Sequence, residues 1–328
     1  MGVFLNPGKE AFEEAVNSKI YVDKTEMVLY LNSIVKTKQK YACVSRPRRF
    51  GKTMAADMLC AYYGIGADSR GLFEKLKIAN SEVPDETKGA PWDKYLGKFD
   101  VIRIVMNRFL NSRQSVYESL EKMQATVIRE IKKTYPDIDL FDDKNLLEAI
   151  EGIYSETGRQ CVVVIDEWDA VFRERADDKE GCREYLDFLR DLLKDNACVA
   201  LAYMTGILPI KKYGKHSALN MFAEYSMMFP KELAAYTGFT DEEVRGLCDD
   251  YRMIYDEVSN WYDGYLVSDY IPVESRDEYR TGEYAGHKIS LYCPLSVVDA
   301  LTTGRIMNYW NKTETYEALA EFIRRDFD

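Results

Sequence analysis

The sequence predicts an α/β fold, with a three-layer αβα core built on a mostly parallel sheet and a smaller helical or winged-helix domain after it. Short apolar runs alternate with longer amphipathic stretches, and the runs are rich in β-branched residues. The composition also changes in the last third of the chain, towards acidic residues and tyrosine. The length of 328 residues allows one large domain or a core plus a smaller appendage.

Four apolar runs are the predicted strands. The run CVVVI at 161–165 is the strongest, because it is β-branched and uninterrupted, as expected of a strand buried on both faces. The others are YACVS at 41–45, VIRIV at 101–105 and VALAYM at 199–204. Their order along the chain, with long connections between them, favours a parallel sheet.

Two amphipathic stretches are the predicted crossover helices. Between the second and third strands, apolar residues recur at spacings of four and three from Val116 to Ile131. The second stretch covers residues 183–193 and carries a stripe of leucines. Amphipathic helices also bind membrane surfaces or partner proteins, but helices that cover a sheet are far commoner.

A domain boundary is expected near residue 236, with residues 1–235 forming the core and its N-terminal extension and residues 236–328 the smaller domain. The second part opens with Thr240 and Glu243, which have the spacing of a capping box. Residues 268–290 are polar, contain proline and several glycines, and lack periodicity. They are expected to form a loop or hairpin insertion.

The charge restricts the partners of the protein. The formal net charge is -11, so the molecule as a whole repels phosphate backbones and does not favour nucleic acid as a partner. Residues 1–100 are nevertheless net positive, while the rest of the chain is strongly acidic. Any polyanion is therefore expected to bind locally, in the first third.

Other residue types exclude several enzyme classes and indicate a compartment. The seven cysteines are scattered singly without a CxxC pair, which is typical of a reducing compartment. The chain has only two histidines, His216 and His287, and no GxSxG, which argues against multi-histidine zinc sites and serine hydrolases. No secretory pattern or bilayer-length apolar run is present, so the expected location is the cytoplasm, without a membrane partner.

A phosphate-binding loop is predicted directly after the first strand, where RPRRFGKT at 46–53 leads into a stretch that can continue as a helix. Backbone N–H groups and the dipole at a helix N-terminus favour a bound anion. Lys52 is expected to reach the β- and γ-phosphates, and Thr53 to bind Mg²⁺. Arg46 stands where the usual GxxxxGK[ST] pattern has its first glycine. The residues expected to contact the nucleotide are Arg46, Pro47, Arg48, Arg49, Phe50, Gly51, Lys52, Thr53 and Met54.

Two acids end the third predicted strand, in the sequence CVVVIDE. In this layout one carboxylate holds Mg²⁺ and the next orients the attacking water. We assign the metal to Asp166 and the catalytic role to Glu167. The fourth strand ends in Thr205 and Gly206; Thr205 either senses the γ-phosphate or the attacking water, or forms a turn.

The cluster of Arg46, Arg48 and Arg49 beside Lys52 has two interpretations. Guanidinium groups suit bidentate phosphate contacts, so the arginines are candidates to stabilise the charge of a bound nucleotide. Alternatively, one or two of them bind carboxylates of the acidic C-terminal part and tie the two parts together. The sequence gives the two nearly equal weight.

Seven segments together resemble the AAA-ATPase-like family of bacterial and archaeal P-loop proteins, whose ATPase domain is often followed by a PD-(D/E)xK nuclease-like domain. The most specific are RPRRFGKT and WYDGY. The segments are YVDKT at 21–25, RPRRFGKT at 46–53, VIDEWD at 164–169, TGILP at 205–209, GFTDEEV at 238–244, WYDGY at 261–265 and YCPLS at 292–296.

The resemblance implies a P-loop NTPase core of the additional-strand catalytic glutamate type, with ATP and Mg²⁺ as cofactors and a C-terminal helical or winged-helix lid. It also makes Arg46 expected, because the family carries RPRRFGK at this place. The nuclease-like domain is not expected in this chain: its nearest E-x-K string, Glu86 to Lys88, follows Pro84 and has no apolar strand before it.

The expected function is Mg²⁺-dependent ATP binding and hydrolysis that drives a conformational switch. Two alternatives stay open. One is a nucleotide-gated regulatory or scaffold module with little hydrolysis, which passes its state to a protein client or effector. The other is an ATP-dependent component of nucleic-acid processing, with the arginine cluster on phosphate backbones. The client and the oligomeric state are not specified by the sequence.

Overall fold

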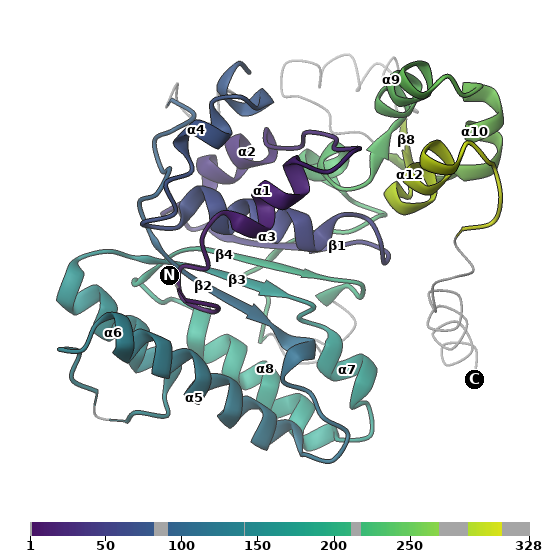
Figure 1. The fold of residues 1–328 in the computed structure, drawn as a ribbon. Helices are drawn as coiled ribbons and strands as arrows, with labels where there is room; N and C mark the ends of the chain where they lie inside the picture. The colour runs from purple at the N-terminus through teal and green to yellow at the C-terminus, as the bar shows by residue number, and fades with distance from the viewer. Residues whose placement is uncertain (1, 82–90, 141, 211–217, 269–287, 310–328) are drawn as a thin grey trace, which may run out of the picture. The chain divides into compact units, whose positions relative to one another are not determined.

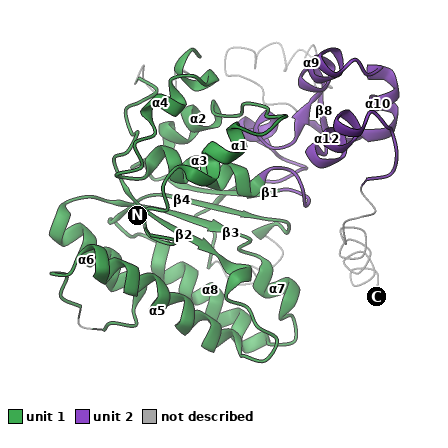
Figure 2. Ribbon diagram, in the orientation of Figure 1, with its two compact units in different colours: residues 1–45, 52–224 green, residues 46–51, 225–328 purple. Residues whose placement is uncertain are grey.

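The structure is a computed structural model that describes residues 2–81, 91–140, 142–210, 218–268 and 288–309 (Figure 1). The chain divides into two compact units, shown in different colours in Figure 2. The first comprises residues 1–45 and 52–224, and the second comprises 46–51 and 225–328. The division between 224 and 225 lies before the expected residue 236, and the short segment 46–51 is grouped with the second unit.

The first unit is built on a parallel sheet whose strand order is β2-β3-β4-β1-β5. The strands are β1 (Tyr41–Ser45), β2 (Asp100–Val105), β3 (Cys161–Asp166), β4 (Val199–Gly206) and β5 (Ala223–Tyr225). The four predicted strands are confirmed, and β1 to β4 pair in parallel. Residues of β1, β3 and β4 are buried throughout, which explains their continuous apolar runs.

Helices cover both faces of this sheet, so the predicted three-layer α/β core is confirmed (Figure 1). One face carries α1, α2 and α3, and the other carries α5, α6 and α8. The helices and short 3-10 turns of the first unit are α1 (Glu10–Val16), α2 (Met27–Ile34), α3 (Lys52–Tyr63), α4 (Arg70–Phe73), η1 (Lys77–Ala79), η3 (Met106–Arg108), α5 (Val116–Thr134), α6 (Leu146–Thr157), α7 (Ala170–Glu174) and α8 (Lys179–Leu193).

The two predicted crossover helices are α5 and α8. Helix α5 begins at a capping box in which the Ser115 hydroxyl accepts from the Glu118 N–H and the Glu118 carboxylate accepts from the Ser115 N–H. Its apolar stripe from Val116 to Ile131 is buried. Helix α8 is longer than predicted, because Asp178 caps its N-terminus by accepting from the Gly181 N–H.

The described part of the second unit contains a three-stranded antiparallel sheet of order β6-β8-β7 and three α-helices. Thr240 and Glu243 form the predicted capping box at the start of α9. Residues 269–287 lie outside the described residues, and with them most of the expected insertion at 268–290. The elements are η5 (Lys231–Tyr236), β6 (Phe239–Thr240), α9 (Asp241–Tyr251), α10 (Tyr255–Tyr262), β7 (Asp263–Ser268), β8 (Lys288–Tyr292) and α12 (Pro294–Thr303).

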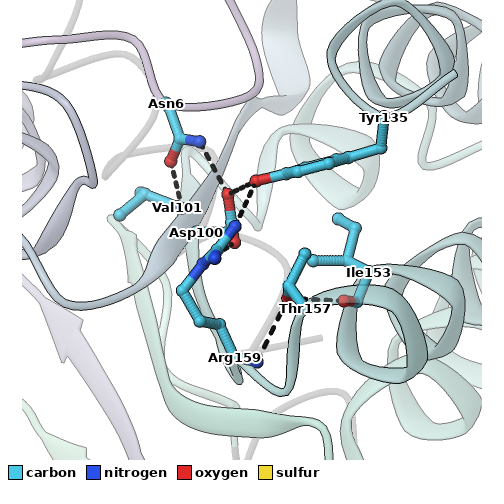
Figure 3. Close-up of polar contacts among 7 residues, drawn as sticks. All are labelled: Asn6, Asp100, Val101, Tyr135, Ile153, Thr157 and Arg159. Carbon is cyan, nitrogen blue, oxygen red and sulfur yellow. Dashed lines mark hydrogen bonds and ion pairs between the residues drawn. The ribbon is translucent and has the colours of Figure 1, made fainter.

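A network of hydrogen bonds lies at the amino-terminal end of β2 (Figure 3). Asp100 is fully buried and accepts hydrogen bonds from Asn6 Nδ2 at 2.8 Å, the Tyr135 hydroxyl at 2.6 Å and Arg159 Nε at 3.1 Å. Asn6 also accepts from the Val101 N–H at 2.7 Å. A buried carboxylate is stable only with such partners, so the network ties the N-terminal segment, α5 and the start of β3 to one strand.

None of the described helices is both long enough and apolar enough to cross a membrane.

We predict that Ser115→Ala lowers the free energy of unfolding by about 1 kcal/mol, because α5 loses the side chain that caps its first turn. Urea denaturation followed by circular dichroism measures the change. Ser115→Asp is the matched control, since aspartate caps helices about as well as serine and should leave the stability near that of the wild type. Equal stability of all three proteins would show that the capping box contributes nothing.

Candidate functional site

The strand register aligns the carboxyl ends of β1, β3 and β4. Strand β4 lies between the other two, and Thr205 pairs with Val44 of β1 on one side and with Asp166 of β3 on the other. The ends of β1 and of β3, the latter with Asp166, therefore flank Thr205 at one edge of the sheet. In open α/β sheets, ligands bind at this edge.

The segment Arg46–Gly51 joins β1 to α3 through two left-handed residues. Arg49 has φ 72° and Gly51 has φ 79°. A left-handed conformation is open to glycine without strain, which accounts for Gly51 directly before the helix. The segment leads into α3, which begins at Lys52, and the first N–H groups and the dipole of a helix favour an anion at such a position.

Arg46 and Phe50 anchor this segment within the second unit. Arg46 is fully buried, and its guanidinium donates to the Tyr225 carbonyl at 2.6 Å and the Leu233 carbonyl at 3.4 Å. Phe50 is 1% exposed and packs edge-on against Tyr265, with ring centroids 5.1 Å apart. Its carbonyl accepts from the N–H of Gly238, where an added Cβ would lie 2.9 Å from the Phe50 ring.

The other nucleotide candidates of the segment and the start of α3 are more accessible. Pro47 and Arg48 are half-buried, and Arg49 is exposed. Thr53, on the first turn of α3, is exposed, and so is Met54. The arginine cluster is thus divided: Arg46 is held by backbone carbonyls, whereas Arg49 is open to solvent.

Lys52 is a buried cation in an acidic environment. Lys52 is 8% exposed, and this burial lowers the pKa of its ammonium to about 8. The carboxylates of Asp169, Asp166 and Glu167 oppose the shift, and the effect of Asp169 is the largest of the three. Burying an ammonium is unfavourable unless negative charge compensates for it. The structure therefore brings Lys52 together with both predicted acids and with Asp169.

Glu167 adopts a strained backbone directly after β3. Its φ is 53°, which is uncommon for a residue with a side chain. Its N–H donates to Asp166 Oδ1 at 3.0 Å, and the next residue, Trp168, donates its N–H to the Thr205 carbonyl at 3.1 Å. These two hydrogen bonds hold the turn at Glu167 against the end of β3 and the end of β4.

Asp169 joins this turn to the segment after β4. It is fully buried, and its Oδ2 accepts from the N–H groups of Ile207 at 3.1 Å and Leu208 at 2.9 Å and from Arg173 Nε at 3.1 Å. Gly206 lies so close that an added Cβ would be 2.6 Å from Asp169 Oδ1. Gly206 is thus required by the close approach of the two segments.

Three buried oxygens at this edge have no hydrogen-bond partner among the described residues: Glu167 Oε2, Asp169 Oδ1 and Thr205 Oγ1. Buried polar atoms without partners are rare and indicate a site for water, an ion or a ligand. They contrast with Asp100 at the opposite end of the same sheet, where both carboxylate oxygens are hydrogen-bonded.

The residues Asp169, Arg103 and Asp57 belong to the site, although sequence analysis gave them no role. Arg103 on β2 lies 3.5 Å from Asp166 Oδ2 and donates to Asp57 of α3. The signal for Arg103 was a charged residue inside the apolar run VIRIV, and Asp169 stands in the segment VIDEWD. Asp57 had no signal of its own, because an acid on an amphipathic helix is ordinary.

The donor groups fit a magnesium ion that is shared with phosphates. Asp166 is 1% exposed and offers a carboxylate, and Thr53 offers a hydroxyl at the start of α3. Mg²⁺ is usually held by one or two carboxylates, water and substrate phosphates, not by a cage of protein ligands. The described part of the chain has no group of three or more histidine, cysteine, aspartate or glutamate residues arranged to hold a metal.

The family is established by comparison with known proteins. The family model described as predicted AAA-ATPase matches residues 8–215, more than half of the chain. The chain therefore belongs to the AAA-ATPase-like family of P-loop proteins, in which nucleotide binding is implied. In the sheet, β4 lies between β1, the strand before the segment Arg46–Gly51, and β3, the strand that ends in Asp166.

Individual relatives are distant. An uncharacterised protein encoded in the vnfD 5′ region of Azotobacter chroococcum mcd 1 is 25% identical over 295 residues, which are 87% of this chain and 53% of that protein. The chain thus spans about half the length of this curated relative. Among solved structures, the ORC1 protein of Aeropyrum pernix, in a complex with DNA, matches with a TM-score of 0.38 and 12% identity, over 98% of this chain and 71% of that chain.

We predict that Lys52 makes the nucleotide-free protein more stable as the pH rises above 8. Below pH 8 the lysine is protonated in both the folded and the unfolded chain; between pH 8 and its ordinary pKa of 10.5 the folded chain holds fewer protons. From pH 7 to 9.5 the free energy of unfolding should rise by about 2 kcal/mol relative to Lys52→Met. Denaturant titrations of both proteins at each pH test this, and parallel pH profiles would contradict it.

Proposed function

We propose that this protein binds ATP with Mg²⁺ at the carboxyl edge of its sheet and hydrolyses it. One observation carries the proposal: the buried ammonium of Lys52 lies at the N-terminus of α3, within electrostatic reach of Asp166 and Glu167. A buried cation at the start of a helix is suited to a highly charged anion, because the helix dipole also favours negative charge there, and the family match supports a nucleotide as that anion.

Lys52 and the first N–H groups of α3 would hold the β- and γ-phosphates. The phosphates supply negative charge next to the Lys52 ammonium, so they favour its protonated form and oppose the lowering of its pKa by burial. Binding would then take up protons above pH 8. Gly51 adopts its left-handed conformation without strain, and because glycine has no Cβ, the backbone here can approach a ligand closely.

Thr53 and Asp166 are the proposed ligands of Mg²⁺. When bound, the ion would neutralise charge that develops on the transferred phosphoryl group. Asp166 has one oxygen engaged by the Glu167 N–H and the other near Arg103, so its orientation is set before any ligand arrives. Preorganised charges of this kind act without a reorganisation cost during the reaction.

Glu167 is the proposed residue that orients the attacking water. Its Oε2 is buried and has no partner among the described residues, so it can accept a hydrogen bond from water. Thr205 Oγ1, equally without a described partner, lies at the end of the strand paired with β3 and can contact the same water or the γ-phosphate. Asp169 and Gly206 hold the two segments together by close packing.

The proposal includes a conformational switch driven by hydrolysis. Residues Arg46–Gly51 pack within the second unit, and Lys52 follows them by one peptide bond. A ligand that rearranges the backbone at this junction would act on the second unit through the chain itself. The switch is of the hinge or ordering kind seen in phosphate-dependent proteins.

Lys52→Ala should weaken ATP binding by about 100-fold or more, because it removes the buried cation that faces the phosphates. A fluorescent ATP analogue titrated against purified protein measures the dissociation constant. Lys40→Ala is the matched control, since Lys40 precedes β1 at its other end and its ammonium donates to the carbonyls of Asn196 and Val199. Equal affinity of Lys52→Ala and wild type would remove Lys52 from the binding site.

Glu167→Gln should retain ATP binding and lose turnover by about 100-fold or more, because glutamine keeps the shape but is a poor base. Phosphate release and nucleotide affinity are measured on the same preparation. Glu156→Gln, on the exposed side of α6, is the control and should match the wild type in both assays. Unchanged turnover in Glu167→Gln would refute the catalytic role of this residue.

A further inference from the structure

Arg103 is an exception within the sheet. It lies in the middle of β2, whose other residues are hydrophobic apart from Asp100, and it is only 8% exposed. A guanidinium in this position is strongly unfavourable unless it is paired and hydrogen-bonded. The partners of Arg103 therefore explain why the strand tolerates it, and Arg103 has no role in the proposed catalytic set.

Both partners of Arg103 are carboxylates on other elements. One nitrogen, Nη1, donates to Asp57 Oδ1 on α3, and the other, Nη2, lies 3.5 Å from Asp166 Oδ2 on β3. The register explains the second contact: Arg103 pairs with Val164, and the next pair on the same face is Val105 with Asp166. The planar fork of arginine can contact two carboxylates at once, which a lysine cannot do as well.

Asp57 also has a defined place relative to the proposed metal ligands. It follows Thr53 by four residues on α3, so the two side chains lie on the same side of the helix, one turn apart. Arg103 thus connects the helix that carries Thr53 to the strand that carries Asp166. The Glu167 N–H holds Asp166 Oδ1 at 3.0 Å, so the carboxylate is contacted from two directions.

We propose that Arg103, held by Asp57, is a positioning residue of the Mg²⁺ site: it fixes the Asp166 carboxylate and its distance from the helix that bears Thr53. This inference rests on the proposed function, because it gives Asp166 and Thr53 their role as metal ligands. Residues that orient metal ligands commonly change metal affinity by tenfold or more when they are removed. Arg103 has no expected contact with the phosphates, so its removal should act on the Mg²⁺ requirement alone.

The test is a Mg²⁺ titration of ATP-analogue binding to the full-length protein, with binding in EDTA measured separately. In Arg103→Gln the Mg²⁺ concentration for half-maximal binding should rise about tenfold, while the affinity in EDTA stays at the wild-type value. Arg159→Gln is the matched control, because it removes an arginine–aspartate pair at the opposite end of the same sheet (Figure 3). Its Mg²⁺ requirement should equal that of the wild type.

The double variant Asp57→Asn/Arg103→Gln separates positioning from charge balance and keeps the test possible if Arg103→Gln alone does not fold. Removing both charges should restore the unfolding midpoint towards the wild type, while the Mg²⁺ requirement stays raised. If the double variant regains normal Mg²⁺ dependence, Arg103 only neutralises Asp57 and the inference is overturned. An unchanged or lower Mg²⁺ requirement in Arg103→Gln overturns it as well. A wild type without Mg²⁺-dependent nucleotide binding would overturn the proposed function itself, and the inference with it.

Discussion

The arrangement at the carboxyl edge of the sheet depends on the burial of one ammonium group, that of Lys52. Burial alone would drive the lysine to its neutral form, and the lowered pKa shows that desolvation outweighs the three carboxylates that oppose it. The carboxylates of Asp169, Asp166 and Glu167 therefore compensate only in part for the burial of the ammonium. Strand β4 places Thr205 between Asp166 of β3 and Val44 of β1, the strand that precedes α3 in the chain.

The buried polar groups at the two ends of the parallel sheet differ in their hydrogen bonding. At the amino end, Asp100 is saturated by Asn6, Tyr135 and Arg159, and the result is a fixed structural junction. At the carboxyl end, Glu167 and Thr205 keep buried oxygens without partners in the described structure, and Glu167 also holds a strained φ. Unsatisfied groups and strain persist only where surrounding contacts hold them, and they are typical of functional sites.

The strands, the two crossover helices, the helix start at Lys52 and the strand end at Asp166 could be predicted because each leaves a local pattern in the sequence. The roles of Lys52 and Asp166 stay predictions. The contacts of Arg103 could not, since they depend on which strand lies beside β2 and in which register, and a single sequence does not show either. The same holds for Arg46, whose bonds to the Tyr225 and Leu233 carbonyls join positions far apart in the chain. In the sequence, Gly206 is typical of a turn. Only the structure, in which Asp169 approaches it closely, shows that a side chain at this position would not fit.

The position of β4 has a consequence for how the protein acquires its structure. Strand β1 is near the start of the chain, yet it pairs with β4, so that Tyr41 lies opposite Ala202. The hydrogen bonds of β1 on that side cannot form until most of the first unit has been synthesised. Such distant pairing slows folding and leaves apolar strands exposed in the meantime. During synthesis, the apolar run of β1 is therefore exposed to incorrect pairing until β4 has been made.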